Sequence, residues 1–383
     1  MDAEIEVAEL LRALDTGEPL LLLDVRNDHD FAAWRIEARS SVETLHVPYF
    51  AFLEDEAALL RRMPRELPIV AVCARGGSSA MVADILRGAG LRARNLVGGM
   101  AAYGDHLDPV PVPLLADDAG RFTIWQLQRR GRGCLSYVIR AGEAAAVVDP
   151  SRHVERYESF VQALGARIAL VLDSHVHADH LSGGAVLAAR SKAPYFAGAS
   201  DACALHGRVT APPADGRLLL APSPDAAPLE LAMLATPGHT PDALSYLVGG
   251  RYLLSGDTLF VGGVGRPDLG DHALAWGREL FRTLHERLAH LPDTTLVLPA
   301  HTSGAAEVGL DGVVSRRLGE LRGLPELRIA SPEEFARTIA ASVTPPPPSY
   351  ARIVAANLDP GIVVAEEAAA WETGANHCAV SAR

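Results

Sequence analysis

Short apolar runs alternate with segments of helical apolar spacing through the first part of the chain. Residues 7–14 have the helical spacing and stop at Gly17, and residues 80–86 have it again. Buried strands are predicted by apolar runs at 20–25, 68–72 and 94–97. Strands that alternate with helices are typical of a parallel sheet, so we expect residues 1–105 to form a small α/β domain.

The pattern becomes rich in strands after a segment with prolines at alternate positions, residues 108–113. Alternate prolines favour an extended spacer, so we expect a linker at 106–120, a second domain at 121–325 and an extension at 326–383. Further strands are predicted at 134–139, 144–149, 167–172, 231–235, 252–256 and 296–300. Further helices are predicted at 153–164, 182–190, 313–321, 332–341 and 366–371.

Metal-competent side chains follow several of these strands. The run at 167–172 leads into Ser174-His175-Val176-His177-Ala178-Asp179-His180. Three later strands are each followed by one such residue: His239, Asp257 and His301. A polar turn would explain one case, but crowded imidazoles are costly to bury unless a metal takes their nitrogens. The series therefore predicts a shared divalent metal site at the strand ends.

A cysteine occupies the end of the strand at 68–72. The segment Cys73-Ala74-Arg75-Gly76-Gly77-Ser78-Ser79 leads from that strand into a helix. Glycines let backbone N–H groups turn toward the sulfur, and both the helix dipole and Arg75 favour the thiolate. The loop alone fits a nucleophilic Cys73 and a buried structural cysteine equally well.

The amino-acid composition argues against some classes of binding partner. The 383 residues carry a formal net charge of −12, which argues against a nucleic-acid or anionic-membrane partner. The acidic N-terminus lacks the apolar stretch of a secretory signal, and no apolar run is long enough to span a bilayer. The four cysteines are scattered without a Cys-x-x-Cys pair, so we read Cys134 and Cys203 as small hydrophobic residues. These features lead us to expect a cytoplasmic protein.

Three motifs in the first domain resemble a single rhodanese domain. They are Asp24-Val25-Arg26, the loop that begins at Cys73, and Leu96-Val97-Gly98-Gly99-Met100. The resemblance implies that Cys73 takes up sulfane sulfur as a persulfide and passes it to an acceptor. The sequence Trp34-Arg35-Ile36-Glu37-Ala38 departs from the family pattern at a place that leaves the cysteine unchanged.

The second domain resembles the metallo-β-lactamase superfamily. The resemblance is carried by the cluster from His175 to His180 and by Pro237-Gly238-His239-Thr240, the segment 255–260, and Pro299-Ala300-His301. It implies an αββα sandwich behind the α/β rhodanese domain, with a C-terminal helical extension. It also implies up to two metals, with Asp257 between them. The implied ligands are His175, His177 and His239 for one metal and Asp179, His180 and His301 for the other.

Within that superfamily, residues 133–137 and 262–268 and the attached rhodanese resemble persulfide dioxygenases. This implies one Fe(II), held by His175, His239 and Asp257, and open positions for a low-molecular-weight thiol persulfide and dioxygen. The persulfide would be oxidised to sulfite, with Cys73 supplying sulfane sulfur or forming thiosulfate. Arg266 is a candidate contact of a metal ligand or of the substrate, with a purely structural role as the alternative. Pro267 departs from the better-known enzymes, and here the rhodanese precedes the metal domain instead of following it.

Two other functions stay open from the sequence. A dinuclear Zn²⁺ hydrolase of the glyoxalase II or thioesterase type would use the full set of ligands and a metal-activated hydroxide. A sulfur carrier or persulfide sensor would need no catalysis, but the complete ligand set argues against it. The fused rhodanese favours sulfur oxidation, and the sequence leaves the oligomeric state open, a homo-oligomer included.

Overall fold

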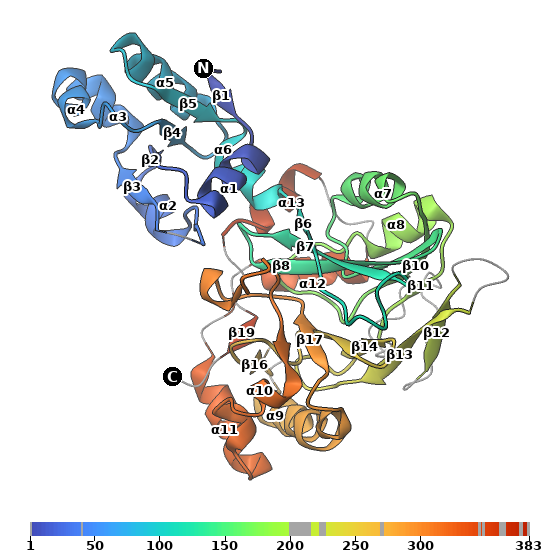
Figure 1. Ribbon diagram of the computed structural model, residues 1–383. Coiled ribbons are helices and arrows are strands. Elements are labelled where there is room, and N and C mark those ends of the chain that lie inside the picture. The colour runs from blue at the N-terminus through green and yellow to red at the C-terminus, as the bar shows by residue number, and fades with distance from the viewer. Residues whose placement is uncertain are drawn as a thin grey trace. The chain divides into compact units, whose positions relative to one another are not determined.

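The computed structural model describes residues 2–39, 41–198, 216–221, 227–268, 272–343, 346, 349–359, 365–374 and 378–380. Cys203 lies outside the described residues. The chain divides into two compact units, labelled by element in Figure 1. Unit 1 comprises Met1–Asp108, Arg129–Arg132 and Thr373–Ala375, and unit 2 comprises the remainder.

Unit 1 is built on a parallel sheet of order β1-β5-β4-β2-β3. Its strands are β1 (Glu4–Ile5), β2 (Leu21–Asp24), β3 (Glu43–His46), β4 (Ile69–Val72) and β5 (Ala93–Leu96). Its helices are α1 (Val7–Thr16), α2 (Asp28–Ala33), α3 (Tyr49–Glu54), α4 (Glu56–Arg62), α5 (Gly77–Gly88) and α6 (Gly99–Asp105). The predicted α/β fold of this part is confirmed.

Both faces of this sheet are covered by helices, because successive side chains of a strand point to opposite faces. Leu21 and Leu23 pack in a core that includes residues of α3, α4 and α5. Leu20 and Leu22 pack in a second core with residues of α1 and α6. Strands buried on both faces explain why the sequence shows continuous apolar runs here.

Unit 2 contains two six-stranded sheets that face each other across one core. The first has the order β11-β10-β9-β8-β7-β6, made of β6 (Asp108–Pro111), β7 (Thr123–Arg129), β8 (Cys134–Ala141), β9 (Ala144–Val148), β10 (Arg167–Leu172) and β11 (Tyr195–Phe196). The second has the order β12-β13-β14-β15-β17-β18, made of β12 (Arg217–Leu220), β13 (Leu229–Ala235), β14 (Leu244–Val248), β15 (Tyr252–Gly256), β17 (Leu296–Pro299) and β18 (Arg316–Arg317). A two-stranded pair joins β16 (Val264–Gly265) to β19 (Ala379–Val380).

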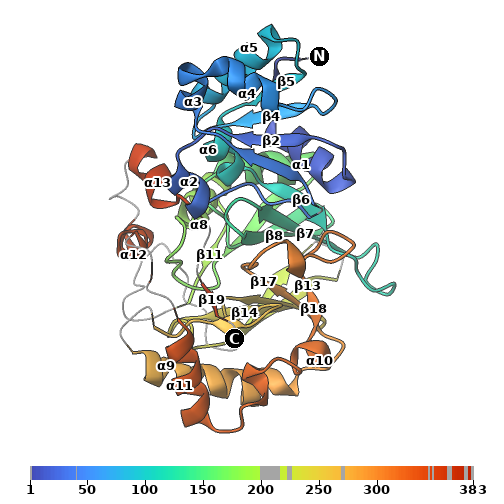
Figure 2. The ribbon, with the colours of Figure 1, turned by 90° about the vertical axis from the view of Figure 1, so that its left-hand side faces the viewer.

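Helices cover the outer face of each sheet of unit 2. Helices α7 (Val154–Ala163) and α8 (Gly184–Ser191) contact β10 of the first sheet. Helices α9 (Ala273–Arg282) and α11 (Pro332–Ser342) pack on each other beyond the second sheet, as Figures 1 and 2 show. On β15, Leu254 faces the core between the sheets and Leu253 faces these helices. The layers are therefore αββα, and the predicted sandwich is confirmed.

The C-terminal part contains helices α10 (Leu318–Leu321), α12 (Tyr350–Leu358) and α13 (Ala365–Trp371). Short 3-10 or π turns occupy Thr283–Arg287, Leu288–His290, Ala305–Glu307 and Glu326–Arg328. Among the described residues, none of the helices combines the length and the apolarity that crossing a bilayer requires.

Two segments differ from the sequence-based expectation. Residues 108–111, expected in a linker, form strand β6 at the edge of the first sheet, a position where proline is tolerated. Residues 313–317 are not helical, although a helix was predicted from residue 313. Val313 and Val314 are buried in the core between the sheets, and the two following arginines of β18 pair with β17. The two β-branched valines thus lie in an extended segment, which their shape favours. Only the end of the predicted helix, Leu318–Leu321, is helical.

We predict that Gly99→Ala destabilises unit 1. Gly99 has φ +57°, and a Cβ there would lie 2.2 Å from the carbonyl oxygen of Cys73 and 2.9 Å from the backbone nitrogen of Gly76. Strain and overpacking together should lower the free energy of unfolding by about 2–4 kcal/mol. Gly88→Ala is the matched control, because its Cβ meets nothing within 4 Å and alanine favours the helix by about 0.5–1 kcal/mol. Urea unfolding of both variants measures the difference, and equal stability would contradict the close packing of Gly99 against the loop of Cys73.

Candidate functional site

The metal-competent residues of unit 2 meet where strands of both sheets end. The loop after β10 carries His175, His177, Asp179 and His180, and three further residues follow strands of the second sheet. His239 lies in the turn after β13, Asp257 directly follows β15, and His301 lies two residues beyond the end of β17. All seven side chains are buried.

Three of these side chains converge on one point. The donor atoms of His175, His239 and Asp257 all lie within 4.8 Å of one another. Oδ2 of Asp257 is 3.7 Å from Nε2 of His175 and 3.4 Å from Nε2 of His239. These three atoms are buried and make no hydrogen bond to described residues. Two neutral nitrogens and one carboxylate oxygen facing a common centre fit a divalent metal, which would satisfy all three.

The outward-facing nitrogens of both histidines have partners that orient the rings. Nδ1 of His239 donates a hydrogen bond to the carbonyl oxygen of Arg266 at 2.8 Å, so its Nε2 keeps a lone pair for a metal. Nδ1 of His175 lies 2.9 Å from Oγ of Ser174. Burial lowers the pKa of His175 well below its usual range and lowers that of His239, which keeps both imidazoles in the neutral, ligating form.

Arg266 contacts this site through its backbone. Its guanidinium is buried and binds Asp268 at two points, 2.7 and 2.8 Å long. Its N–H donates to the carbonyl oxygen of Cys378 at 3.3 Å. The sequence suggested that Arg266 contacts a metal ligand or the substrate, and in the structure its backbone contacts His239 and the C-terminal segment.

A second group of donors lies beside the first. It consists of Cys134, Asp179, His180 and His301, whose donor atoms also lie within 4.8 Å of one another. Nε2 of His301 is 2.9 Å from Oδ2 of Asp179, and Nδ1 of His301 is 2.6 Å from Oδ1 of Asp257. The carboxylate of Asp257 is therefore shared: Oδ1 accepts from His301 and Oδ2 faces the first group.

The charges of this second group are mutually stabilised. Burial disfavours the charged form of His301 and so lowers its pKa. The carboxylates of Asp257 and Asp179 outweigh burial and raise the pKa of His301 well above its usual range. Burial also opposes ionisation of Asp257, but the neighbouring His301 lowers the pKa of that carboxyl. Burial and Asp179 raise the pKa of Cys134, yet hydrogen bonds with His180 and His301 bring it down to about 7. The thiol of Cys134 is thus unusually easy to ionise for a fully buried group.

The imidazole of His177 lies outside the group of His175, His239 and Asp257. Its Nε2 lies 3.3 Å from Oδ1 of Asp149 and 4.0 Å from Oδ1 of Asp173, and these three residues form a separate group. Asp149 has φ 51°, and its Oδ1 accepts the N–H of Ser174 at 2.6 Å, which anchors the start of the histidine loop. The structure therefore brings His175, His239 and Asp257 together without His177.

Two cysteines lie at the site that sequence reasoning did not place there. Cys134 was read as a small hydrophobic residue, although the motif around it had already been noted. Cys378 is buried, has its Sγ 3.5 Å from the hydroxyl of Tyr350, and groups with Asp257 and His301. The pairing of β19 with β16 brings it there from the end of the chain. The one signal in the sequence is that Cys378 directly follows His377, a pair that could line a site or an interface, and His377 lies outside the described residues.

In unit 1, Cys73 sits in the cradle that the glycine-rich loop predicts. The N–H of Gly76 donates to its Sγ at 3.1 Å, and Oγ of Ser79 lies 3.1 Å from the same sulfur. Burial opposes ionisation, but the hydroxyl of Ser79 and backbone N–H groups of Ser79, Arg75 and Gly76 lower the pKa of Cys73. The side chain of Arg75 is exposed, and Arg75 lowers the pKa of Cys73 through its backbone N–H group.

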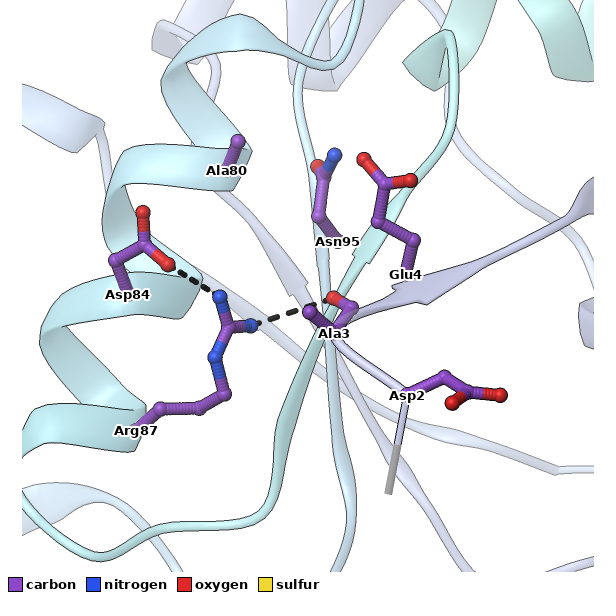
Figure 3. Close-up of a pocket in the computed structure, with 7 residues that line it drawn as sticks. All are labelled: Asp2, Ala3, Glu4, Ala80, Asp84, Arg87 and Asn95. Atoms are coloured by element: carbon purple, nitrogen blue, oxygen red, sulfur yellow. Dashed lines mark hydrogen bonds and ion pairs between the residues drawn. The ribbon is translucent and has the colours of Figure 1, made fainter.

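Unit 1 also has a surface pocket of about 380 Å³, drawn in Figure 3. In it Arg87 binds the carboxylate of Asp84 and donates to the carbonyl oxygen of Ala3. The pocket is lined by Asp2, Ala3, Glu4, Ala80, Asp84, Arg87 and Asn95, and Cys73 is not among these. With three carboxylates against one guanidinium it disfavours anions such as thiosulfate, so we assign it no part in sulfur transfer.

The fold and the buried donor groups fit a metal-binding αββα domain that is preceded by an α/β domain with a cysteine-containing loop. The sequence profile of the metallo-beta-lactamase superfamily matches residues 129–301, and that of the rhodanese-like domain matches residues 6–106. The chain belongs to the metallo-beta-lactamase superfamily and carries an N-terminal rhodanese-like domain.

Relatives of two activities are similar to this chain. A hydroxyacylglutathione hydrolase of Acidiphilium cryptum is 34% identical over 232 residues, which cover 54% of this chain and 90% of the relative. The mitochondrial persulfide dioxygenase ETHE1 of Bos taurus is 28% identical over 225 residues, covering 58% and 82%. The crystal structure of ETHE1 from Myxococcus xanthus matches with a TM-score of 0.51 and 30% identity, covering 62% of this chain and 98% of that one.

We predict that Ser79→Ala raises the pKa of Cys73. Loss of the hydroxyl removes the largest of the stabilising contacts on the thiolate, so less of the nucleophile is present near neutral pH. The rate of alkylation by iodoacetamide, followed for Cys73 by peptide mass spectrometry, should rise at higher pH in the variant than in the wild type. Arg75→Ala is the matched control, because the backbone N–H of residue 75 remains. The pH dependence of Cys73 alkylation in this variant should equal that of the wild type. A profile that moved for Arg75→Ala and not for Ser79→Ala would contradict this assignment.

Proposed function

We propose that the chain is a non-haem Fe(II) persulfide dioxygenase coupled to a rhodanese sulfurtransferase. The observation that carries this proposal is the three-donor group of His175, His239 and Asp257, in which two nitrogens and one oxygen make no hydrogen bond to any described residue. With His177 turned toward Asp149 and Asp173, this set leaves open positions on an octahedral metal. The similarity to persulfide dioxygenases supports the same choice.

The iron would supply open positions for a persulfide sulfur and dioxygen and the redox capacity to join them. The overall change consumes one dioxygen and one water per thiol persulfide and releases thiol, sulfite and two protons. The chain's own residues provide orientation: the carbonyl of Arg266 fixes the tautomer of His239, and His301 holds the second oxygen of Asp257. None of the three donor residues is more than 2% exposed, which would limit access of bulk water to a bound persulfide.

The rhodanese-like unit would transfer sulfane sulfur, either to a thiol before the oxidation or to the sulfite that the oxidation releases. The thiolate of Cys73, stabilised by Ser79 and backbone N–H groups, would attack the outer sulfur of a donor such as thiosulfate, whose S–S bond breaks to release sulfite, and would carry that sulfur as a persulfide. Delivery to sulfite would yield thiosulfate, and delivery to a thiol would yield the substrate of the metal site. The partners are therefore a low-molecular-weight thiol persulfide, dioxygen, sulfite and thiosulfate.

A dinuclear Zn²⁺ hydrolase is the second candidate. The similarity to a hydroxyacylglutathione hydrolase favours it, as does the second donor group that contains Asp179, His180 and His301. It would require Asp257 to bridge two metals and His177 to ligate one of them. The contacts of Asp257 with His301 and of His177 with Asp149 and Asp173 favour the mononuclear alternative.

We predict that His239→Ala and His177→Ala have different effects on iron. After anaerobic reconstitution, His239→Ala should bind iron more than about a hundredfold more weakly and lose persulfide-dependent oxygen uptake to the same extent. Changes to residues that only orient a ligand already lower metal affinity or activity by about 10–100-fold. His177→Ala should keep near-stoichiometric iron, because Nε2 of His177 lies near the carboxylates of Asp149 and Asp173 and not in the three-donor group. Iron and zinc are quantified by mass spectrometry, and oxygen uptake is measured with glutathione persulfide.

The same measurements can reject the proposal. Wild-type protein that retains zinc at two per chain, takes up no oxygen with iron loaded, and hydrolyses a glutathione thioester would establish the hydrolase instead. Loss of a metal in His177→Ala would place that histidine among the ligands.

We predict that Cys73→Ser abolishes transfer of sulfur from thiosulfate to cyanide and leaves oxygen uptake with added glutathione persulfide intact. Serine keeps the size of the side chain but cannot carry a persulfide. Colorimetric thiocyanate formation measures the transfer, and Cys134→Ser serves as a thiol control because Cys134 lies in the other unit. Transfer retained in Cys73→Ser would remove the cysteine from its assigned role.

A further inference from the structure

The histidine loop, residues 174–182, is covered by segments from the end of the chain. Its two buried apolar residues both pack there. Ala178 lies in one cluster with Tyr350 of α12 and Cys378, and Leu181 lies in a second cluster with residues of α12 and α13. The C-terminal extension therefore encloses the part of the loop that follows the first two histidines.

Asn357 of α12 binds the main chain of this loop at three points. Its Nδ2 donates to the carbonyl oxygens of His177 at 2.8 Å and of His180 at 2.9 Å. Its Oδ1 accepts the N–H of Ser182 at 2.9 Å. A carboxamide has two N–H donors and one oxygen, so both donors and the oxygen of Asn357 are engaged. These partners also fix the orientation of the amide, because the reverse orientation would set its oxygen against two carbonyl oxygens.

Further hydrogen bonds anchor the loop on either side of these contacts. At its start, the N–H of Ser174 donates to Oδ1 of Asp149, which follows β9, at 2.6 Å. Near its end, the N–H of Leu181 donates to Oε1 of Glu372 at 2.8 Å, and Glu372 directly follows α13. The first sheet thus holds the start of the loop, and two side chains of the C-terminal extension bind the main chain of residues 177–182.

We propose that Asn357 is a positioning residue of the metal site and that the C-terminal extension completes this site. Asn357 fixes the peptide groups that follow His177 and His180, and Asp179 lies between them. The direction in which the side chain of Asp179 leaves the backbone is therefore set by α12. A loop that carries site residues needs such support, because its own backbone has few internal hydrogen bonds.

A chain of contacts connects the position of Asp179 to the three-donor group. Oδ2 of Asp179 is 2.9 Å from Nε2 of His301, and Nδ1 of His301 is 2.6 Å from Oδ1 of Asp257. The other oxygen of Asp257 faces His175 and His239. A displaced loop would therefore move the carboxylate that the three-donor group shares. The proposal concerns the geometry of the metal site and applies to oxidation and to hydrolysis alike.

The sharpest change is Asn357→Asp, which replaces one nitrogen by oxygen and keeps the acceptor for the N–H of Ser182. The new oxygen would lie at hydrogen-bond distance from two carbonyl oxygens and would repel both. Asn357→Ala removes the donors without adding an oxygen, so its effect should have the same direction and be smaller. Both changes leave every metal-competent side chain in place.

The test is a titration of the metal-depleted full-length chain with Co²⁺, whose visible absorption depends on the number and arrangement of its ligands. The signal that His239→Ala removes is assigned to the three-donor group. Asn357→Asp should bind this ion about 10–100-fold more weakly and with an altered visible spectrum, as changes to residues that orient a ligand do. Asn357→Ala should bind it about tenfold more weakly.

Ser331→Ala is the matched control for a loss of stability in the same extension. Oγ of Ser331 accepts the N–H of Glu334 at the start of α11, which packs on α9. This variant should unfold at a lower temperature while its affinity for Co²⁺ and its spectrum equal those of the wild type. Hydrogen exchange of residues 175–183 in the metal-depleted chain, followed by peptide mass spectrometry, should be faster in Asn357→Asp and unchanged in Ser331→Ala.

Several outcomes would overturn the proposal. Wild-type affinity and spectrum in Asn357→Asp, together with a lower unfolding temperature, would make Asn357 a purely structural residue. If Asn357→Asp does not fold, wild-type affinity in Asn357→Ala would lead to the same conclusion. Absence of Co²⁺ binding in the wild type would also reject it. Oxygen uptake enters none of these measurements, so a failure of the dioxygenase proposal would leave the result for Asn357 unaffected.

Discussion

The burial of ionisable donors between two sheets is the constraint on which unit 2 depends. Asp179, His239 and His301 have no exposed surface, and Asp257 has almost none. A buried charge without a partner costs several kcal/mol, so each donor needs a hydrogen bond, an opposite charge or a metal. Asp257 meets this need in two directions, through Oδ1 to His301 and through Oδ2 toward His175 and His239. The remaining geometry of the site follows from keeping that carboxylate in place.

The backbone around Asp257 shows how closely it is held. A Cβ on Gly265 would lie 1.9 Å from the carbonyl oxygen of Asp257 and 3.0 Å from Cβ of His239, so only glycine fits there. The strand that contains Gly265 pairs with β19, and the next residue, Arg266, accepts the hydrogen bond of His239. The C-terminal segment thus supports the strand that orients one metal ligand. A ligand set built from separate strands gains its precision from such main-chain packing, because side chains alone retain rotamer freedom.

Much of this architecture could be predicted from the sequence, because it depends on local pattern. Apolar runs predicted the strands, and the residues that follow them included His175, His239, Asp257 and His301, because such strand ends meet at one edge of the two facing sheets. The orientation of His177 toward Asp149 and Asp173 could not be predicted, because a side-chain rotamer depends on neighbours distant in sequence. The same holds for Cys134, which reaches His301 through a bridge between residues 134 and 301. The helix predicted from residue 313 failed because tertiary burial of two valines outweighed apolar spacing.

The two groups of donors are linked through His301. Its Nδ1 lies 2.6 Å from Oδ1 of Asp257, and its Nε2 lies 2.9 Å from Oδ2 of Asp179. Burial opposes the charged form of this imidazole, but both carboxylates raise its pKa well above its usual range. A divalent ion drawn to Oδ2 of Asp257 would compete with His301 for the charge of that carboxylate, so metal binding at the first group and the proton on His301 are coupled. The donor that connects the two groups is therefore as important to the first group as its own three side chains.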